Sequence, residues 1–326
     1  MSITHSNQIR LRPFESSDLE PVVAMWNDCL PKDPITIEKF WRFFLLDPNF
    51  RPESAFVAES DGKPIGFLQA VARRVPVGIF PLTPTLGYIT TFFVEQDFRQ
   101  RGIGRSLVQK GLAFLRNHGC QTVTCNGYVP FYAFPGVDIE YAEACGLLNS
   151  MGFRQLTELV AMGLPLRGVT TPPAVMARAS SLASEGFMVR QFELADTLPL
   201  LSFMEEHFPH WHQSLIDGLQ IKLENVFVAM KGTDVVGFAQ WENPQTDPPS
   251  GAPGRFGPFG VHPDLRNNGL GSVLFYQVIE QVSHRGADTL WFGWAGGRNL
   301  SFYERVGCRV TRQYTLFRID LTEGGG

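Results

Sequence analysis

The sequence is poor in cysteine and has no long apolar run. Its five cysteines among 326 residues form an odd number without Cys-x-x-Cys spacing, which argues against a disulfide framework and a zinc site. No apolar stretch approaches the ~18 residues of a membrane span, and the amino-terminal residues lack the basic-then-apolar pattern of a signal peptide. We therefore expect a cytoplasmic protein without a metal or a membrane association.

An excess of positive charge is also missing. The chain has 28 Lys and Arg against 32 Asp and Glu, a net charge of −4, so it lacks the basic surface typical of nucleic-acid-binding proteins. Its 44% hydrophobic content is that of a folded protein, and its length suits two domains of roughly 100–200 residues each. Composition thus predicts two separate cores.

One sequence unit is present twice. Residues 12–18 and 190–196 share the pattern Arg-x-Phe-Glu-x-x-Asp. Residues 55–69 match 226–240 as two hairpins, each with a glycine in its turn. The repeat predicts a domain over 1–168, a linker over 169–186 and a second domain over 187–326. The aspartates that end the shorter pattern, Asp18 and Asp196, precede predicted helices and are expected to cap them.

A glycine-containing turn also occurs twice. Residues 99–104 read Arg-Gln-Arg-Gly-Ile-Gly and residues 266–271 read Arg-Asn-Asn-Gly-Leu-Gly. Each turn lies between an apolar strand, at 86–94 or 256–261, and a helix expected at 103–118 or 270–285. A helix start carries free N–H groups and a partial positive charge, and glycine lets a phosphate approach the backbone. The spacing is neither that of a dinucleotide fingerprint nor that of a Walker loop, and it predicts a phosphate-binding turn in each copy.

This turn, between a strand and a helix, resembles the acetyl-CoA site of the GNAT superfamily of N-acetyltransferases, and the resemblance covers nearly the whole chain. It implies two tandem α/β domains, each with a mixed sheet, that use acetyl-CoA as co-substrate and need no metal. It also implies that the strand before the turn bulges, and that its backbone binds the pantetheine arm. The residues so assigned to the coenzyme are Phe92, Phe93, Val94, Arg99, Gln100, Arg101, Gly102, Ile103, Gly104, Arg105 and Ser106 in the first copy, and Phe259, Gly260, Val261, Arg266, Asn267, Asn268, Gly269, Leu270, Gly271 and Ser272 in the second.

The resemblance implies catalytic residues in the second copy. Asn299 and Tyr303 stand where family members often have an Asn and a Tyr, and the phenol would protonate the departing thiolate. The first copy has Leu148 at the position of Tyr303, and an aliphatic side chain cannot deliver a proton. Tyr132 or Tyr141 could replace the phenol there, although a structural role is the simpler interpretation. The second copy is therefore the better-equipped catalyst, behind a less basic turn.

The sequence identifies the general base and the acceptor-binding residue less specifically than the coenzyme site. Glu242, Glu205 and Glu206 are candidates for the base in the second copy, and Glu95 in the first is expected to face solvent. Asp138 either binds a cationic acceptor or caps a turn.

The His-rich segment at 207–212 contains a proline and has no cysteine nearby, so we expect it to line the acceptor site rather than bind a metal.

Taken as a whole, the sequence predicts acetyl transfer from acetyl-CoA to the primary amine of a small molecule rather than of a protein, by a monomer or homodimer. Two alternatives stay open. The chain could bind the coenzyme as a sensor without turnover, or the first copy alone could catalyse.

Overall fold

The chain folds into two compact units, each assembled from both halves of the sequence. The computed structural model describes residues 9–76, 81–128, 131, 134–242, 254–297 and 299–321. Unit 1 contains the described residues up to Leu159 together with those from Gln313 onward, and unit 2 contains Val160–Arg312. Within the described ranges, no helix is long and apolar enough to cross a membrane.

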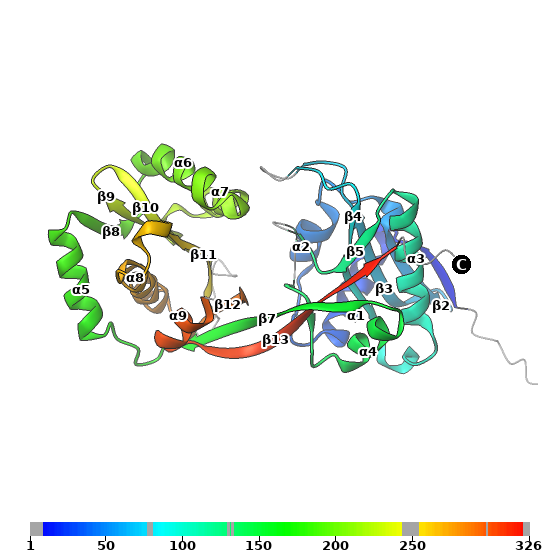
Figure 1. Cartoon of the computed structure of the whole chain (residues 1–326). Coiled ribbons are helices and arrows are strands. Elements are labelled where there is room, and N and C mark those ends of the chain that lie inside the picture. Colours follow the sequence, from blue (N-terminus) through cyan, green and yellow to red (C-terminus); the bar gives the residue numbers. More distant parts are fainter. Residues whose placement is uncertain are drawn as a thin grey trace, which may run out of the picture. The chain divides into compact units, whose positions relative to one another are not determined.

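Unit 1 is a mixed sheet with helices on both faces (Figure 1). The strand order is β1-β2-β3-β4-β5-β13. Its strands and helices are β1 (Arg10–Pro13), α1 (Leu19–Cys29), α2 (Ile37–Phe40), β2 (Ala55–Ser60), β3 (Lys63–Ala72), β4 (Leu86–Val94), α3 (Ile103–Asn117), β5 (Thr122–Cys125), β6 (Val137–Asp138), α4 (Ala142–Ser150) and the later part of β13 (Arg309–Asp320).

The two faces of this sheet carry separate cores, as the period-two alternation of its strands requires. Leu68 and Phe92 face the cluster that includes α3. Phe67 and Phe93 face an aromatic cluster with Trp26 of α1. We call the second face the acceptor face, because it is opposite the helix that follows the glycine turn.

Unit 2 repeats this plan, with the strand order β8-β9-β10-β11-β12-β7. Its elements are the later part of β7 (Arg154–Pro165), α5 (Pro173–Ser184), β8 (Phe187–Gln191), α6 (Thr197–His207), α7 (His212–Ile221), β9 (Val226–Lys231), β10 (Asp234–Glu242), β11 (Gly254–Val261), α8 (Leu270–His284), β12 (Thr289–Ala295) and α9 (Asn299–Arg305). The two hairpins and the two long helices fall where the repeat predicts them.

The last strands of the two halves are exchanged. β13, from the end of the chain, pairs with β5 of unit 1 through Phe317 and Cys125. β7, from the first half, pairs with β12 of unit 2 through Leu164 and Leu290. The repeat in the sequence had instead predicted two contiguous domains, 1–168 and 187–326, on either side of a linker. Because β5 and β12 are equivalent edges of related copies, local sequence does not specify which last strand each one receives.

Asp18 and Asp196 serve a different purpose from the expected one. Neither caps the long helix after it; each turns back to accept two hydrogen bonds from an arginine, at 2.6 and 2.8 Å, from Arg12 and Arg190 respectively. Each also accepts the backbone N–H three residues earlier, at 2.8 Å. The repeated Arg-x-Phe-Glu-x-x-Asp pattern is therefore a bidentate ion pair that ties the first strand of each repeat to its first helix.

Removing this pair from unit 2 is expected to destabilise it. The hydrogen bonds from Arg190 lower the pKa of Asp196 below its usual value near 3.8, so its stabilisation is complete above that value and fades as the pH falls through the lowered one. Asp196→Asn should cost about 1–3 kcal/mol at pH 7 and less in strong acid. Urea unfolding at pH 7 and in strong acid measures the free energy of unfolding of the variant and the wild type. Asp264→Asn, at an exposed position, is the control. An equal loss of stability under both conditions would contradict the ion-pair explanation.

Candidate functional site

Each unit has a fork where two parallel strands separate. In unit 1 the last residue pair between β4 and β5 is Ile89 with Cys125, and β4 continues to Val94. In unit 2 the last pair between β11 and β12 is Arg255 with Trp291, and β11 continues to Val261. The separated strand offers its backbone to an extended ligand on that side.

A bulge accompanies each fork. Thr90 is the extra residue of β4 opposite Gln69 and Ala70, and its hydroxyl donates to Gln69 Oε1 at 2.6 Å. In β11, Gly257 and Pro258 lie opposite Gln240 alone. Bulges twist and bend a strand, so they help to separate each strand from its neighbour. The bulged strand implied by the family resemblance is thus present twice.

The turns after the forks have the same backbone geometry. Gln100 and Asn267 have φ values of 59° and 62°, and Gly102 and Gly269, which precede α3 and α8, have 81° and 88°. Glycine suits the last positions because side chains disfavour positive φ. This geometry leaves the first N–H groups of each helix without acceptors inside the helix, as phosphate binding requires. We call residues 99–106 and 266–272 the phosphate cradles of units 1 and 2.

The arginines of the motif hold the turn rather than extend into it. Arg99 Nε donates to Val94 O at 3.0 Å, and its guanidinium lies 3.5 Å from Glu143. Arg101 donates to Asp97 O at 2.8 Å and lies over the Phe98 ring. Arg266 donates to Val261 O at 3.4 Å. In this conformation these three arginine side chains are thus directed to backbone carbonyl groups of the turn and its flanks.

The cradle of unit 2 differs from that of unit 1 in two hydrogen bonds, one within the cradle and one from α5. Asn268 Oδ1 accepts the N–H of Leu270 at 2.9 Å, and Arg178 of α5 donates from Nε to Asn268 O. The side chain of Arg178 lies against Gly269, whereas the space beside Gly102 is open. Sequence reasoning missed Arg178 because it lies in the predicted linker, where no motif marks it.

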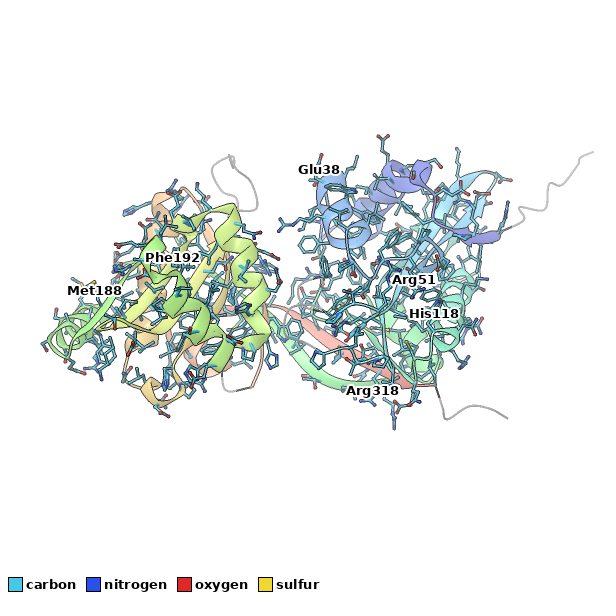
Figure 2. The ribbon with its side chains drawn as sticks, turned by 90° about the horizontal axis from the view of Figure 1, so that it is seen from above. Glu38, Arg51, His118, Met188, Phe192 and Arg318 are labelled. Atoms are coloured by element: carbon cyan, nitrogen blue, oxygen red, sulfur yellow. The ribbon has the colours of Figure 1, made fainter. Side chains whose placement is uncertain are left out.

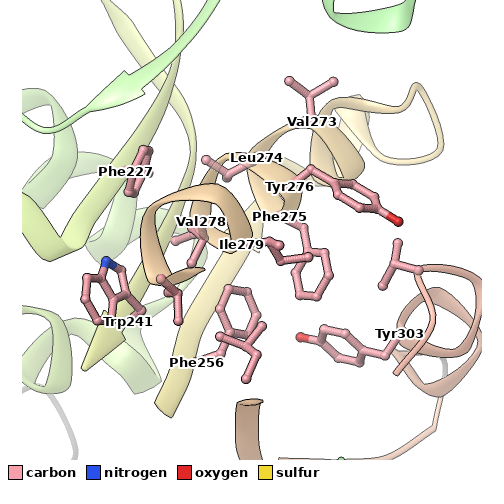
Figure 3. Close-up of a cluster of buried hydrophobic side chains, with 14 of the residues drawn as sticks. Phe227, Trp241, Phe256, Val273, Leu274, Phe275, Tyr276, Val278, Ile279 and Tyr303 are labelled. Atoms are coloured by element: carbon pink, nitrogen blue, oxygen red, sulfur yellow. The ribbon is translucent and has the colours of Figure 1, made fainter. Parts of the chain in front are cut away.

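Tyr303 lies at the fork of unit 2. Phe256 and Phe292 are the first residues beyond the last strand pair, and the Tyr303 ring centroid is 6.4 and 4.3 Å from theirs. Figure 3 shows its hydroxyl directed toward Phe256. Burial raises the pKa of Tyr303, so the phenol stays protonated at neutral pH, as a general acid must. Leu148 is fully buried in α4 of unit 1, and Asn299 begins α9.

Of the three candidate bases in unit 2, Glu242 lies beside the fork. Its carboxylate is 2.9 Å from the Arg255 guanidinium and accepts from Gln240 Nε2 at 3.3 Å. Arg255 belongs to the last strand pair, which places Glu242 at the base of the fork. Glu205 and Glu206 are exposed on α6. Glu95 of unit 1 is exposed after β4, as expected.

Asp138 is a turn residue. Its Oδ1 accepts the N–H of Glu140 at 2.8 Å, and the ammonium group of Lys32 lies 4.0 Å from its Oδ2. Asp138 therefore caps a turn, and its binding of a cationic acceptor stays a prediction. Tyr132 falls outside the described residues, and Tyr141 immediately precedes α4.

The His-rich segment packs on aromatic rings. His207 lies 4.5 Å from the His262 ring and 5.1 Å from Phe203, and Phe208 lies against Gly260 of β11, where an added Cβ would be 2.6 Å from its ring. Phe208 thus takes the place that the Phe93 side chain has in unit 1. Among the residues that the structure describes, no group of three or more His, Cys, Asp or Glu could hold a metal ion.

Unit 1 has a buried polar network on its acceptor face that sequence reasoning also missed. The Tyr128 hydroxyl lies 2.5 Å from both oxygens of Asp47 and accepts from Asn49 Nδ2 at 2.8 Å. The Arg73 guanidinium lies over the Tyr128 ring. Burial raises the pKa of Asp47 despite these hydrogen bonds. Asp47 and Asn49 flank Pro48, and no motif in the sequence links them to Tyr128.

Comparison with known proteins follows the same division into two copies. The model of the acetyltransferase (GNAT) family matches residues 19–133 and again 192–308. A search of curated protein sequences found no significant match.

Similar solved structures cover almost the whole chain. The glucosamine N-acetyltransferase region of a fungal multi-domain GH3 β-N-acetylglucosaminidase has a TM-score of 0.80 and 20% identity; the match covers 97% of this chain and 38% of that one. A GNAT protein from Sphaerobacter thermophilus has a TM-score of 0.69 and 19% identity, and the match covers 96% of this chain and 95% of that one.

A tandem GNAT protein from the clavulanic acid biosynthesis pathway has a TM-score of 0.67 and 15% identity, covering 98% and 100% of the two chains. At these identities the likeness concerns the fold, which confirms the predicted tandem arrangement. With both copies matched by the family model over most of their length, the chain belongs to the GNAT family of acetyltransferases.

Proposed function

We propose that this protein transfers an acetyl group from acetyl-CoA to the primary amine of a small molecule, and that unit 2 is the catalytic unit. The observation that carries the proposal is the position of Tyr303, a buried and protonated phenol at the base of the β11–β12 fork. Unit 1 has Leu148 at the matching position. Acetyl-CoA would supply the activated acetyl group.

Different groups of unit 2 would bind the coenzyme, polarise the thioester and transfer protons. The N–H groups of the first turn of α8 after Leu270 would bind the coenzyme pyrophosphate, and the backbone of β11 beyond its last pair with β12 would hold the pantetheine arm. A backbone N–H of β11 beyond the bulge would polarise the thioester carbonyl. Tyr303 Oη would give its proton to the coenzyme sulfur, and Glu242 would take the proton of the acceptor ammonium.

Glu242→Gln is expected to lower kcat/KM for the amine about 10²-fold near neutral pH, because the amide cannot accept a proton from the ammonium. The loss should shrink as the pH approaches the amine's own pKa, where the free amine becomes abundant. The pH profile of kcat/KM measures this, with Glu205→Gln on the exposed side of α6 as control. A loss of the same size at every pH would contradict the role as base.

The first acceptor to assay is glucosamine, because the structural relative with a TM-score of 0.80 is a glucosamine N-acetyltransferase region. Release of thiol from acetyl-CoA should depend on an added amine, across a panel of amino sugars, diamines and amino acids. Acetyl-CoA binding without amine-dependent thiol release would instead support the sensor hypothesis.

One observation favours catalysis by unit 1 as a second candidate. Asp47 and Tyr128 form a buried acid and phenol pair on the acceptor face, with the bulge residue Thr90 hydrogen-bonded to Gln69 on the same face. If unit 1 catalyses, Tyr128→Phe abolishes thiol release while Tyr303→Phe leaves it intact. The primary proposal requires the opposite pattern.

A further inference from the structure

The cradle of unit 2 is less basic than that of unit 1 and yet has an arginine beside it. Asn267 and Asn268 stand where unit 1 has Gln100 and Arg101. Arg266, the one arginine in the motif of unit 2, is directed to Val261 O. The positive side chain found at this cradle comes from outside the motif.

We propose that Arg178 is the phosphate-binding cation of unit 2, and that it contacts the pyrophosphate of acetyl-CoA; this inference rests on the proposed function. Its Cγ lies 2.7 Å from where a Cβ on Gly269 would be, and its Nε donates to Asn268 O. The guanidinium thus lies beside the left-handed residue from which α8 starts. A dianionic pyrophosphate at the free N–H groups of α8 comes within reach of it.

Arg178 is held in this position by its own helix. Its Nη1 donates to Glu185 Oε1 at 2.7 Å and to Ser181 Oγ at 3.0 Å, and α5 packs against α8. Within the described part of the chain, Nη2 of Arg178 has no hydrogen-bond partner, so the guanidinium group keeps an N–H donor for a ligand. A side chain already ordered by Glu185 loses little further entropy when it binds an anion.

The duplication supplies an internal comparison. In unit 1 the residue before Ile103 is Gly102, and nothing lies within 4 Å of the position that a Cβ would take there. Unit 1 instead has Arg105 in the first turn of α3, where unit 2 has Ser272. Each cradle therefore has its own source of positive charge, and that of unit 2 comes from α5.

Steady-state kinetics with two donors test this assignment. Arg178→Ala should raise the KM for acetyl-CoA roughly ten- to hundredfold, the range for a hydrogen bond between charged groups, with kcat unchanged. Arg178→Lys should recover part of the loss. With acetyl-pantetheine, a donor without phosphates, kcat/KM should be the same in wild type and Arg178→Ala. Met176→Ala, exposed on the same helix, controls for changes in α5.

Three results would overturn the inference. An unchanged KM would leave Arg178 without a role in binding, and a lower KM would make it an obstruction of the cradle. An equal loss with both donors would make its role structural. Failure of the proposed function looks different: wild type would then bind acetyl-CoA in calorimetric titration without amine-dependent turnover, and the effect of Arg178→Ala on that binding would still test the inference.

Discussion

Tyr303→Phe is expected to lower kcat about 10²–10⁴-fold while leaving the affinity for acetyl-CoA unchanged. The ring keeps its packing against Phe256 and Phe292, so the variant removes the proton donor and little else. Because burial raises the pKa of this phenol, its acidic form persists across neutral pH, and the loss should be nearly constant there. Thiol release measures turnover, and calorimetry measures binding.

Tyr276→Phe is the matched control, because Tyr276 is another buried tyrosine of unit 2 and its pKa is also raised by burial (Figure 3). It lies on α8 and has no part in the proposed catalysis. Turnover should therefore survive in Tyr276→Phe. Full activity in Tyr303→Phe would remove the support for unit 2 as the catalyst and favour the Asp47 and Tyr128 network of unit 1.

Phe317→Ala is expected to destabilise unit 1 although the residue belongs to the last strand of the chain. Phe317 is fully buried in the core between the sheet and α3, and β13 completes that sheet beside β5. Truncating a buried phenylalanine costs about 3–5 kcal/mol. Melting followed by the fluorescence of Trp26, which lies in unit 1, reports this loss when the other tryptophans are replaced by phenylalanine.

The exchanged strands make a stronger form of this prediction. A fragment of residues 1–153 would lack β13 and also β7, so neither last strand could cover the edge of β5, and the α3 core would be open at Phe317. We expect it to be much less stable than unit 1 of the full chain. Leu316→Ala, at the half-buried neighbouring position, is the control for the point variant. A fragment as stable as the full chain would contradict the role of β13 in completing the sheet of unit 1.

The fold and the cradles were predictable from sequence because their signals are local. A hairpin needs a glycine turn between alternating strands, and a phosphate-binding helix start needs glycine at fixed spacing, as at Gly102 and Gly269. Duplication doubled each signal. The position of Tyr303 at the fork follows from the same motif spacing, once α9 is placed after β12.

What escaped prediction depends on contacts between distant segments. Arg178 reaches Asn268 from a helix in the predicted linker, and Tyr128 reaches Asp47 across the acceptor face. No spacing rule joins such pairs. The exchange of last strands was hidden for another reason: two equivalent edges accept either strand, and only the packing of the whole unit decides between them.

Figure 2 shows the side chains of both units. Each unit has a fork in which a coenzyme could bind. A crystal structure of the protein with acetyl-CoA tests the central claim most directly. The account predicts coenzyme in the β11–β12 fork, with its sulfur about 3–3.5 Å from Tyr303 Oη. Coenzyme bound only in the β4–β5 fork, with the aromatic rings around Tyr303 still packed together, would contradict it.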